Sequence, residues 1–237
     1  MIHSELLMPA CKLSKNALDS LGNRIEGWGI GEKRGNIKYS PPLNWIGIGL
    51  KVLDKYENNM WVGMENIEGE WCVAYHGVGY SVPSDDLKNK IRLIYFGGLK
   101  AGSGQLHEDC PDYYHKGEKV GRGVYCSPKI KTAGEYAGQC EINSKKYYTV
   151  FMLRVKQSKI RHCNQCEDSK KPNYYWVLNG TPVEIRPYRI LYKCVKKEDD
   201  EDDEDDEDNE DDKEDEDDKD DKDSEYDKDS EDEDDDY

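Results

Sequence analysis

The stretch Val73-Ala74-Tyr75-His76-Gly77 carries most of the information about this fold. An apolar run that is bounded by glycine predicts a β-strand. Further along lies Gly121-Arg122-Gly123-Val124-Tyr125, and Tyr136 follows 11 positions beyond Tyr125. A histidine can bind a ribose hydroxyl, a glycine backbone can approach an amide closely, and a tyrosine offers a stacking face. Together these residues predict a pocket for a nicotinamide dinucleotide.

Charge divides the chain into two parts. Residues 198–237 contain 31 Asp or Glu and 4 Lys, a net charge of -27, so the preceding 197 residues carry +10. The acidic segment has little apolar surface to bury and its charges repel one another. It therefore cannot offset the roughly 1–2 kcal/mol per residue that ordering a backbone costs. We expect a disordered acidic tail.

The rest of the chain is long enough for one domain with its own core. It also holds all 5 Trp and all but two of the 17 Tyr, the large side chains from which a core can be built. We expect this domain over residues 46–197, with residues 1–45 as an irregular extension that packs on it or leads into it. No run approaches the roughly 18 apolar residues of a membrane span, and no signal peptide is evident. The sequence thus predicts an intracellular protein, cytoplasmic or nuclear, without a membrane partner.

The pattern along the domain is mainly β. A helix is expected from a Ser84 cap to Gly97-Gly98, with an apolar face of Leu87, Ile91 and Ile94. Shorter helices are expected at 15–21 and at 131–137, and the second of these carries Tyr136. The predicted strands cover residues 45–52, 71–75, 123–126, 147–155, 174–178 and 183–195. Neither a βαβ repeat nor a solenoid period is present, which favours an α+β fold built on two antiparallel sheets.

No metal is expected. The 8 cysteines are scattered through a chain too large to depend on disulfides, so we expect reduced thiols. Cys163 and Cys166 resemble half of a zinc site, but a structural site needs four ligands and no second Cys-x-x-Cys exists. The Gly-rich stretch 27–31 lacks the preceding strand and following helix of a phosphate-binding loop, so we expect a plain loop there.

From about Glu70 to Val195 the motifs resemble those of the poly(ADP-ribose) polymerase-like ADP-ribosyltransferases, which are related in fold to diphtheria toxin. The shared features, in order, are His76-Gly77, Gly98-Leu99, Gly121-x-Gly123-Val124-Tyr125 and Tyr136. The resemblance implies split antiparallel sheets with short flanking helices. It also implies a glycosyltransferase chemistry that takes NAD as substrate and releases nicotinamide.

The resemblance assigns roles residue by residue. His76 would bind the 2′-hydroxyl of the nicotinamide ribose, and the backbone of Gly77 would pair with the carboxamide. Tyr125 would wall the pocket and Tyr136 would stack on the nicotinamide ring. Ala133 stands where the family often has a serine that supports the carboxamide.

The third catalytic position, a glutamate in the polymerases, has two candidates. Matching the apolar end of the last strand, residues 190–192, places Tyr188 there. Matching by chemistry places Glu184 there, but it lies four residues earlier. Arg186, two residues from each, could pair with Glu184 on one face of the strand. Without an aligned carboxylate, chain elongation is disfavoured, so the sequence favours mono-ADP-ribosylation.

The implied partner is a protein acceptor, and the tail with Ser224 and Ser230 is one candidate acceptor. The tail also suits basic proteins, and it could equally serve only to solubilise the chain. We do not expect nucleic-acid binding, because Lys and Arg are spread along the domain rather than clustered. An inactive pocket of the same fold, acting as a binding or scaffolding module through the tail, stays open as an alternative.

Overall fold

The computed structural model describes residues 13–26, 32–39, 41–101, 114–115, 118–119, 123–163, 175–179 and 181–195. The chain divides into two units, residues 1–197 and 198–237, and every described residue belongs to the first. The described part is a mixed α+β structure with antiparallel sheets and few helices. The expected tail, the glycine-rich stretch 27–31 and Cys166 lie outside the described residues.

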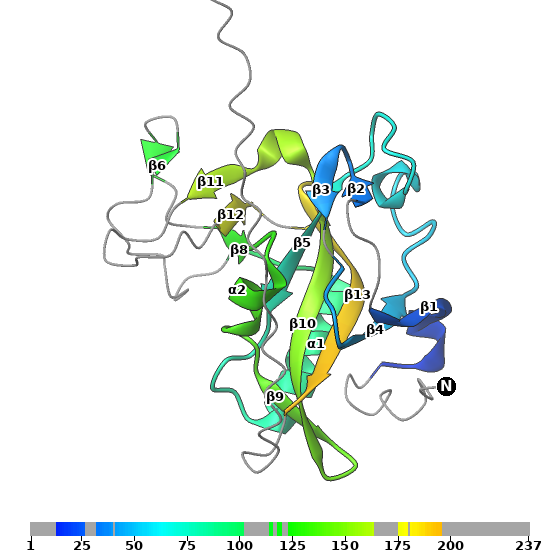
Figure 1. Cartoon of the computed structure of the whole chain (residues 1–237), viewed down its shortest axis with the longest axis vertical. Coiled ribbons are helices and arrows are strands. Elements are labelled where there is room, and N and C mark those ends of the chain that lie inside the picture. The colour runs from blue at the N-terminus through cyan, green and yellow to red at the C-terminus, as the bar shows by residue number, and fades with distance from the viewer. Residues whose placement is uncertain are drawn as a thin grey trace, which may run out of the picture. The chain divides into compact units, whose positions relative to one another are not determined.

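The main sheet is antiparallel throughout (Figure 1). In spatial order its strands are β1 (Leu18–Glu26), β4 (Trp45–Leu50), β13 (Ile185–Cys194), β10 (Lys145–Val155) and β5 (Cys72–Gly77). β9 (Gln139–Ile142) pairs with one end of β10, so β13 and β10 lie at the centre of the sheet. β5 carries the His-Gly pair at its end, as predicted.

A second sheet consists of β11 (Arg161–Cys163), β12 (Tyr175–Leu178) and β8 (Val124–Cys126). Ser127, which directly follows β8, forms a backbone bridge with Tyr75 of β5. The Tyr75 N–H donates to the Ser127 carbonyl at 2.8 Å, and the Ser127 N–H donates to the Tyr75 carbonyl at 2.9 Å. Two small hairpins complete the strands of the described residues: β2 (Glu32–Arg34) with β3 (Ile37–Tyr39), and β6 (Tyr114–His115) with β7 (Glu118–Lys119).

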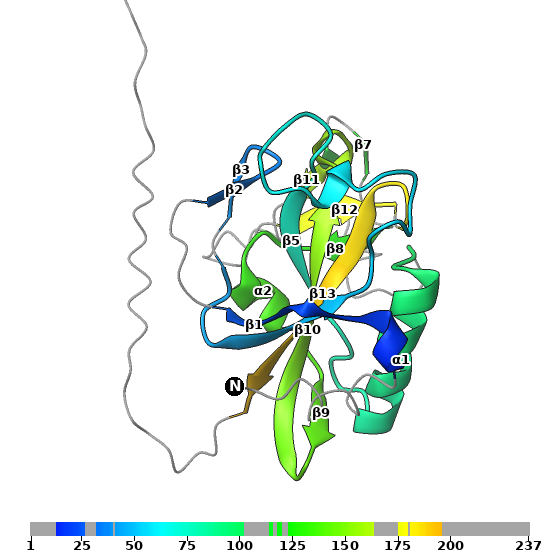
Figure 2. The same cartoon turned by 90° about the vertical axis from the view of Figure 1, so that its right-hand side faces the viewer.

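Two α-helices, α1 (Ser84–Gly97) and α2 (Ile130–Gly134), lie on opposite faces of the main sheet (Figure 2). Strand β10 alternates between the two resulting cores. On one side Phe151 and Leu153 share a core with Leu87, Ile91 and Tyr95 of α1. On the other side Val150 and Met152 pack with Ala133 of α2 and with Val73 and Tyr75 of β5. Burying each large apolar side chain contributes about 1.5–3 kcal/mol, so both faces of this sheet stabilise the fold.

Short 3-10 helices lie at Lys15–Ala17, Met60–Val62 and Gln157–Lys159. The helix expected at 15–21 is wrong, because strand β1 already begins at Leu18 and pairs with β4, with Leu18 opposite Leu50. Pairing with a buried strand outweighs the weak local preference of this segment for helix.

The long helix was predicted correctly, but its start and its buried face differ from expectation. Pro83 occupies the cap position, and the Ser84 hydroxyl instead accepts a hydrogen bond from the Glu141 N–H at 3.0 Å. Tyr95 completes the buried face, while Ile94 is only half-buried. At the C-terminal end Gly98 has a φ of +73°, a conformation that glycine adopts at little cost.

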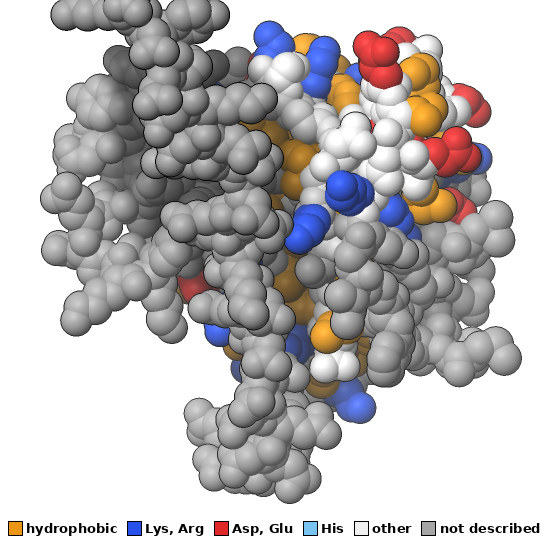
Figure 3. Space-filling model, turned by 45° about the horizontal axis from the view of Figure 1, so that its top comes forward, with side chains coloured by type: hydrophobic (Ala, Val, Ile, Leu, Met, Phe, Trp, Pro, Cys, Tyr) orange, Lys and Arg blue, Asp and Glu red, His pale blue; other side chains and the backbone are white. Residues whose placement is uncertain are grey.

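Helix α2 ends at Gly134, earlier than the predicted 137, so Tyr136 lies in the turn that follows it. None of the helices among the described residues is long and apolar enough to span a membrane. On the face drawn in Figure 3, the described Lys and Arg side chains are spread among apolar and acidic ones rather than gathered in one block.

Candidate functional site

The site is organised by the end of strand β5. Successive side chains of a strand point to opposite faces of its sheet, so His76 lies on the same face as Cys72 and Ala74, the face that α1 covers. His76 and Gly77 there line a cleft of about 290 Å³. The remaining cleft residues are Val78, Gly79, Lys90, Leu93, Ile94, Gly98, Leu99 and Lys100.

The His76 ring is held by strand β8. Its Nδ1 lies 2.7 Å from the carbonyl oxygen of Tyr125. A carbonyl can only accept, so Nδ1 carries the proton and Nε2 is left with a free lone pair in the neutral ring. Burial lowers the pKa of His76 below its usual 6.5, which outweighs the opposite effect of the bond to Tyr125. The site therefore presents a neutral imidazole whose Nε2 can accept a hydrogen bond.

Gly77 sits against the turn that follows α2. A Cβ atom placed on Gly77 would lie 2.2 Å from the Ala133 carbonyl oxygen and 2.9 Å from the Tyr136 Cβ. Only a residue without a side chain fits there. Just beyond, the Gly138 N–H donates to the Val78 carbonyl at 2.7 Å. The structure thus brings Gly77, Ala133 and Tyr136 together at the end of β5.

The two tyrosines of the motif approach from different elements. Tyr125 lies in β8 opposite Val177 of β12, and Tyr136 lies in the turn after α2; both side chains are half-buried. Ala133 and its neighbour Thr132 are buried. The Tyr125 carbonyl therefore contacts His76 on the face of α1, whereas Ala133 and Tyr136 contact Gly77 on the face of α2, and the two groups meet at one end of β5. Gly121 and Arg122 lie outside the described residues.

Tyr188 lies elsewhere in the main sheet. It occupies an irregularity of β13, where the pairing with β10 shifts between Met152 and Leu153. Its ring lies 5.4 Å from the guanidinium carbon of Arg154 and 5.6 Å from that of Arg189. Because β10 separates β13 from β5, a whole strand intervenes between Tyr188 and the His76 strand.

Glu184 is engaged in the turn between β12 and β13. Its Oε2 accepts from the Asn179 N–H at 2.6 Å, and its Oε1 accepts from the Asn179 Nδ2 at 3.0 Å. The side chain is buried, so this carboxylate fixes the turn through which the chain enters β13.

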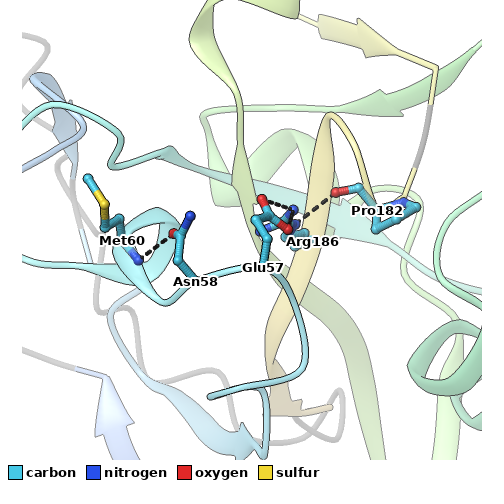
Figure 4. Close-up of polar contacts among 5 residues, drawn as sticks. All are labelled: Glu57, Asn58, Met60, Pro182 and Arg186. Carbon is cyan, nitrogen blue, oxygen red and sulfur yellow. Dashed lines mark hydrogen bonds and ion pairs between the residues drawn. The ribbon is translucent and has the colours of Figure 1, made fainter.

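Arg186 does not pair with Glu184, contrary to expectation; it pairs with Glu57. Its Nη2 lies 2.8 and 2.9 Å from the two Glu57 carboxylate oxygens, and its Nε donates to the Pro182 carbonyl at 2.7 Å (Figure 4). The guanidinium carbon lies 4.1 Å from the centre of the Tyr56 ring and 4.4 Å from that of Trp71. This bond from Arg186 lowers the pKa of the Glu57 carboxyl. Cation–π contacts with these rings favour this long-range partner over a neighbour in sequence.

Two features of the site were missed at the level of sequence. The first is the cleft cations Lys90 and Lys100, one on α1 and one beside the Gly98-Leu99 pair. The second is the pairing of β12 with β8, which places β12 next to the strand of Tyr125. The strand itself was predicted at residues 174–178, but a local pattern does not determine which strand it pairs with.

The described residues contain no group of three or more His, Cys, Asp or Glu placed to hold a metal ion. Burial raises the pKa of the Cys72 thiol to about 12, so this thiol stays protonated and unreactive at neutral pH. No protein-family model and no curated protein matches the sequence.

Proposed function

We propose that this protein is an NAD-dependent ADP-ribosyltransferase of the poly(ADP-ribose) polymerase-like fold, which transfers a single ADP-ribose to a protein acceptor and releases nicotinamide. One observation carries the proposal. Gly77 fits against the Ala133–Tyr136 turn while the adjacent His76 is fixed to Tyr125. A structural histidine in a plain strand end would not require this close packing of three separate segments.

The chemistry needs a group that fixes the sugar and a surface that holds the leaving group. Nε2 of neutral His76 is suited to accept a hydrogen bond from a ribose hydroxyl. The backbone of Gly77 is suited to the carboxamide, and Tyr136 to stacking on the nicotinamide ring. The bond from ribose C1′ to the positively charged ring nitrogen breaks, and its electron pair stays on that nitrogen, so nicotinamide leaves as a neutral molecule. The acceptor atom bonds to C1′ and loses a proton, and the site must stabilise the positive charge that develops on the sugar.

The cleft beside His76 suits the remainder of such a substrate. Lys90 and Lys100 are exposed cations on its lining, and the diphosphate of NAD carries negative charge. Leu93, Ile94 and Leu99 supply an apolar wall between them. A cleft with this mixture fits a nucleotide better than a purely apolar ligand.

The environment of Glu184 supports transfer of a single unit. Its carboxylate is buried, accepts two hydrogen bonds from Asn179 and is not among the residues that line the cleft at His76, so it is not aligned on an acceptor there. Tyr188 then remains the other candidate for the third catalytic position. Candidate acceptors are other proteins and the chain's own tail.

The engagement of the Glu184 carboxylate by Asn179 also favours a second function. If neither Glu184 nor Tyr188 serves catalysis, the pocket would bind NAD without turning it over, and Ala133 in place of a serine would weaken that binding. The protein would then be a binding module that acts on basic proteins through its acidic tail. Nucleic acid is not part of either proposal.

Labelled NAD distinguishes the two functions. Nicotinamide release and protein labelling would be measured for the full chain, a chain truncated after Lys197, and the His76→Ala variant. Lys145→Ala, an exposed change on a distant hairpin, is the matched control. Release by all but His76→Ala supports the transferase, and label confined to the full chain identifies the tail as acceptor. If the folded proteins bind NAD but release no nicotinamide, the protein is a binding module and not a transferase.

A further inference from the structure

The Gly98–Leu99 wall of the cleft is clamped by the turn at residues 181–184, which leads into β13. The Leu99 N–H donates to the Thr181 hydroxyl oxygen at 2.9 Å, and the Thr181 N–H donates to the Leu99 carbonyl at 2.8 Å. A Cβ atom placed on Gly98 would lie 2.3 Å from the Thr181 Cβ, so these two segments of the chain are in close contact. Gly98 and Leu99 both line the cleft.

The turn that carries Thr181 is itself firmly held. Arg186 donates to the Pro182 carbonyl and is anchored by the Glu57 carboxylate (Figure 4). Glu184 closes the other end of the turn on Asn179. Charge-assisted hydrogen bonds thus fix both ends of this turn, so the turn can hold Thr181, and through it Leu99, in a defined position.

We propose that Thr181 is a positioning residue that sets the affinity of the cleft for NAD by holding the Gly98–Leu99 wall. This inference rests on the proposed function. Lys100 follows Leu99 directly, so the clamp also fixes the backbone from which this cation reaches the cleft. His76 is held separately, by Tyr125 of β8. Loosening the wall should therefore weaken substrate binding and leave the chemical step unchanged.

The test compares Thr181→Val with Thr181→Ser in the full chain. Valine keeps the shape but removes the acceptor of the Leu99 N–H, whereas serine keeps it. An unsatisfied buried donor is costly, so the KM for NAD should rise about tenfold in Thr181→Val, with kcat within about twofold. Thr181→Ser should restore the KM. Hydrogen exchange at the Leu99 amide, measured without NAD, should be faster in Thr181→Val alone.

Thr181→Ala removes the same acceptor and replaces Thr181→Val if that variant does not fold. If the wild type turns over NAD and Thr181→Val has the same KM as the wild type, the inference is overturned and the proposed function stands. A fall in kcat equal to the loss in kcat/KM also overturns it. A wild type that neither binds nor cleaves NAD overturns the proposed function, and with it any role of Thr181 toward NAD.

Discussion

Replacing Gly77 by alanine tests the core of the site most directly. The added Cβ would meet the Ala133 carbonyl oxygen at 2.2 Å, the Tyr136 carbonyl carbon at 2.7 Å and the Tyr136 Cβ at 2.9 Å. The first two are backbone atoms, so no flexible side chain can move aside. The end of β5 and the turn after α2 must separate by about 1 Å to restore normal van der Waals contact.

The expected loss of stability follows from that overlap. Overpacking of a well-packed site costs about 1–3 kcal/mol. For a domain of this size each kcal/mol lowers the Tm by about 2–4 °C, which gives a fall of about 2–12 °C. A misplacement of about 1 Å in an active site can cost about 100-fold in rate, so nicotinamide release should fall by about 10- to 100-fold.

Gly97→Ala is the matched control, because no atom lies within 4 Å of its added Cβ at the end of α1. Removing a helical glycine should leave the protein unchanged or stabilise it by about 0.5–1 kcal/mol. Both variants would be compared by thermal unfolding and by nicotinamide release. If Gly77→Ala matches Gly97→Ala in Tm and in rate, Gly77 does not pack against the Ala133–Tyr136 turn and the proposed site is wrong.

The remaining predictions of this kind concern polar groups. Because burial lowers the pKa of His76, the neutral ring contributes stability fully above pH 6.5, and this is lost as the pH falls below 6.5 toward the folded-state pKa. The difference in Tm between pH 8 and pH 5.5 should therefore be smaller in His76→Gln than in the wild type. Arg186→Leu should cost about 2–4 kcal/mol in urea unfolding, whereas Glu57→Gln should cost about 1 kcal/mol or less, since the Glu57 side chain is 64% exposed. Glu184→Ala should cost about 1–3 kcal/mol because the Asn179 N–H loses its acceptor. Tyr188→Phe should lower nicotinamide release, because Tyr188 is the remaining candidate for the third catalytic position.

The elements that flank the site could be predicted because each is encoded locally. Strand β5 is an apolar run bounded by glycine, and α1 shows helical spacing of Leu87 and Ile91 between an acidic first turn and Gly98. β10 alternates between its two cores and is rich in aromatic and β-branched residues. The placement of Gly77 beside Tyr136 was expected from the resemblance, and the close approach gives that expectation a steric basis.

The contacts that were not predicted join residues far apart in the chain. Arg186 lies 129 positions from Glu57, and Thr181 lies 82 positions from Leu99. Local patterns carry no information on such pairings, because strand order and register decide them. The same reason explains the error at residues 15–21, where pairing of β1 with β4 overrides the local preference.

The two sides of the cleft are held by different parts of the molecule, and this has a consequence for function. The His76–Gly77 side depends on β8 and on the turn after α2, whereas the Gly98–Leu99 side depends on the turn at 181–184. Changes on the first side should act on the chemical step, and changes on the second side on affinity. Since the two supports come from different turns of the chain, a Gly77→Ala, Thr181→Val double variant should show nearly additive losses in kcat/KM. A strong coupling between them would mean that the cleft closes as one unit around NAD.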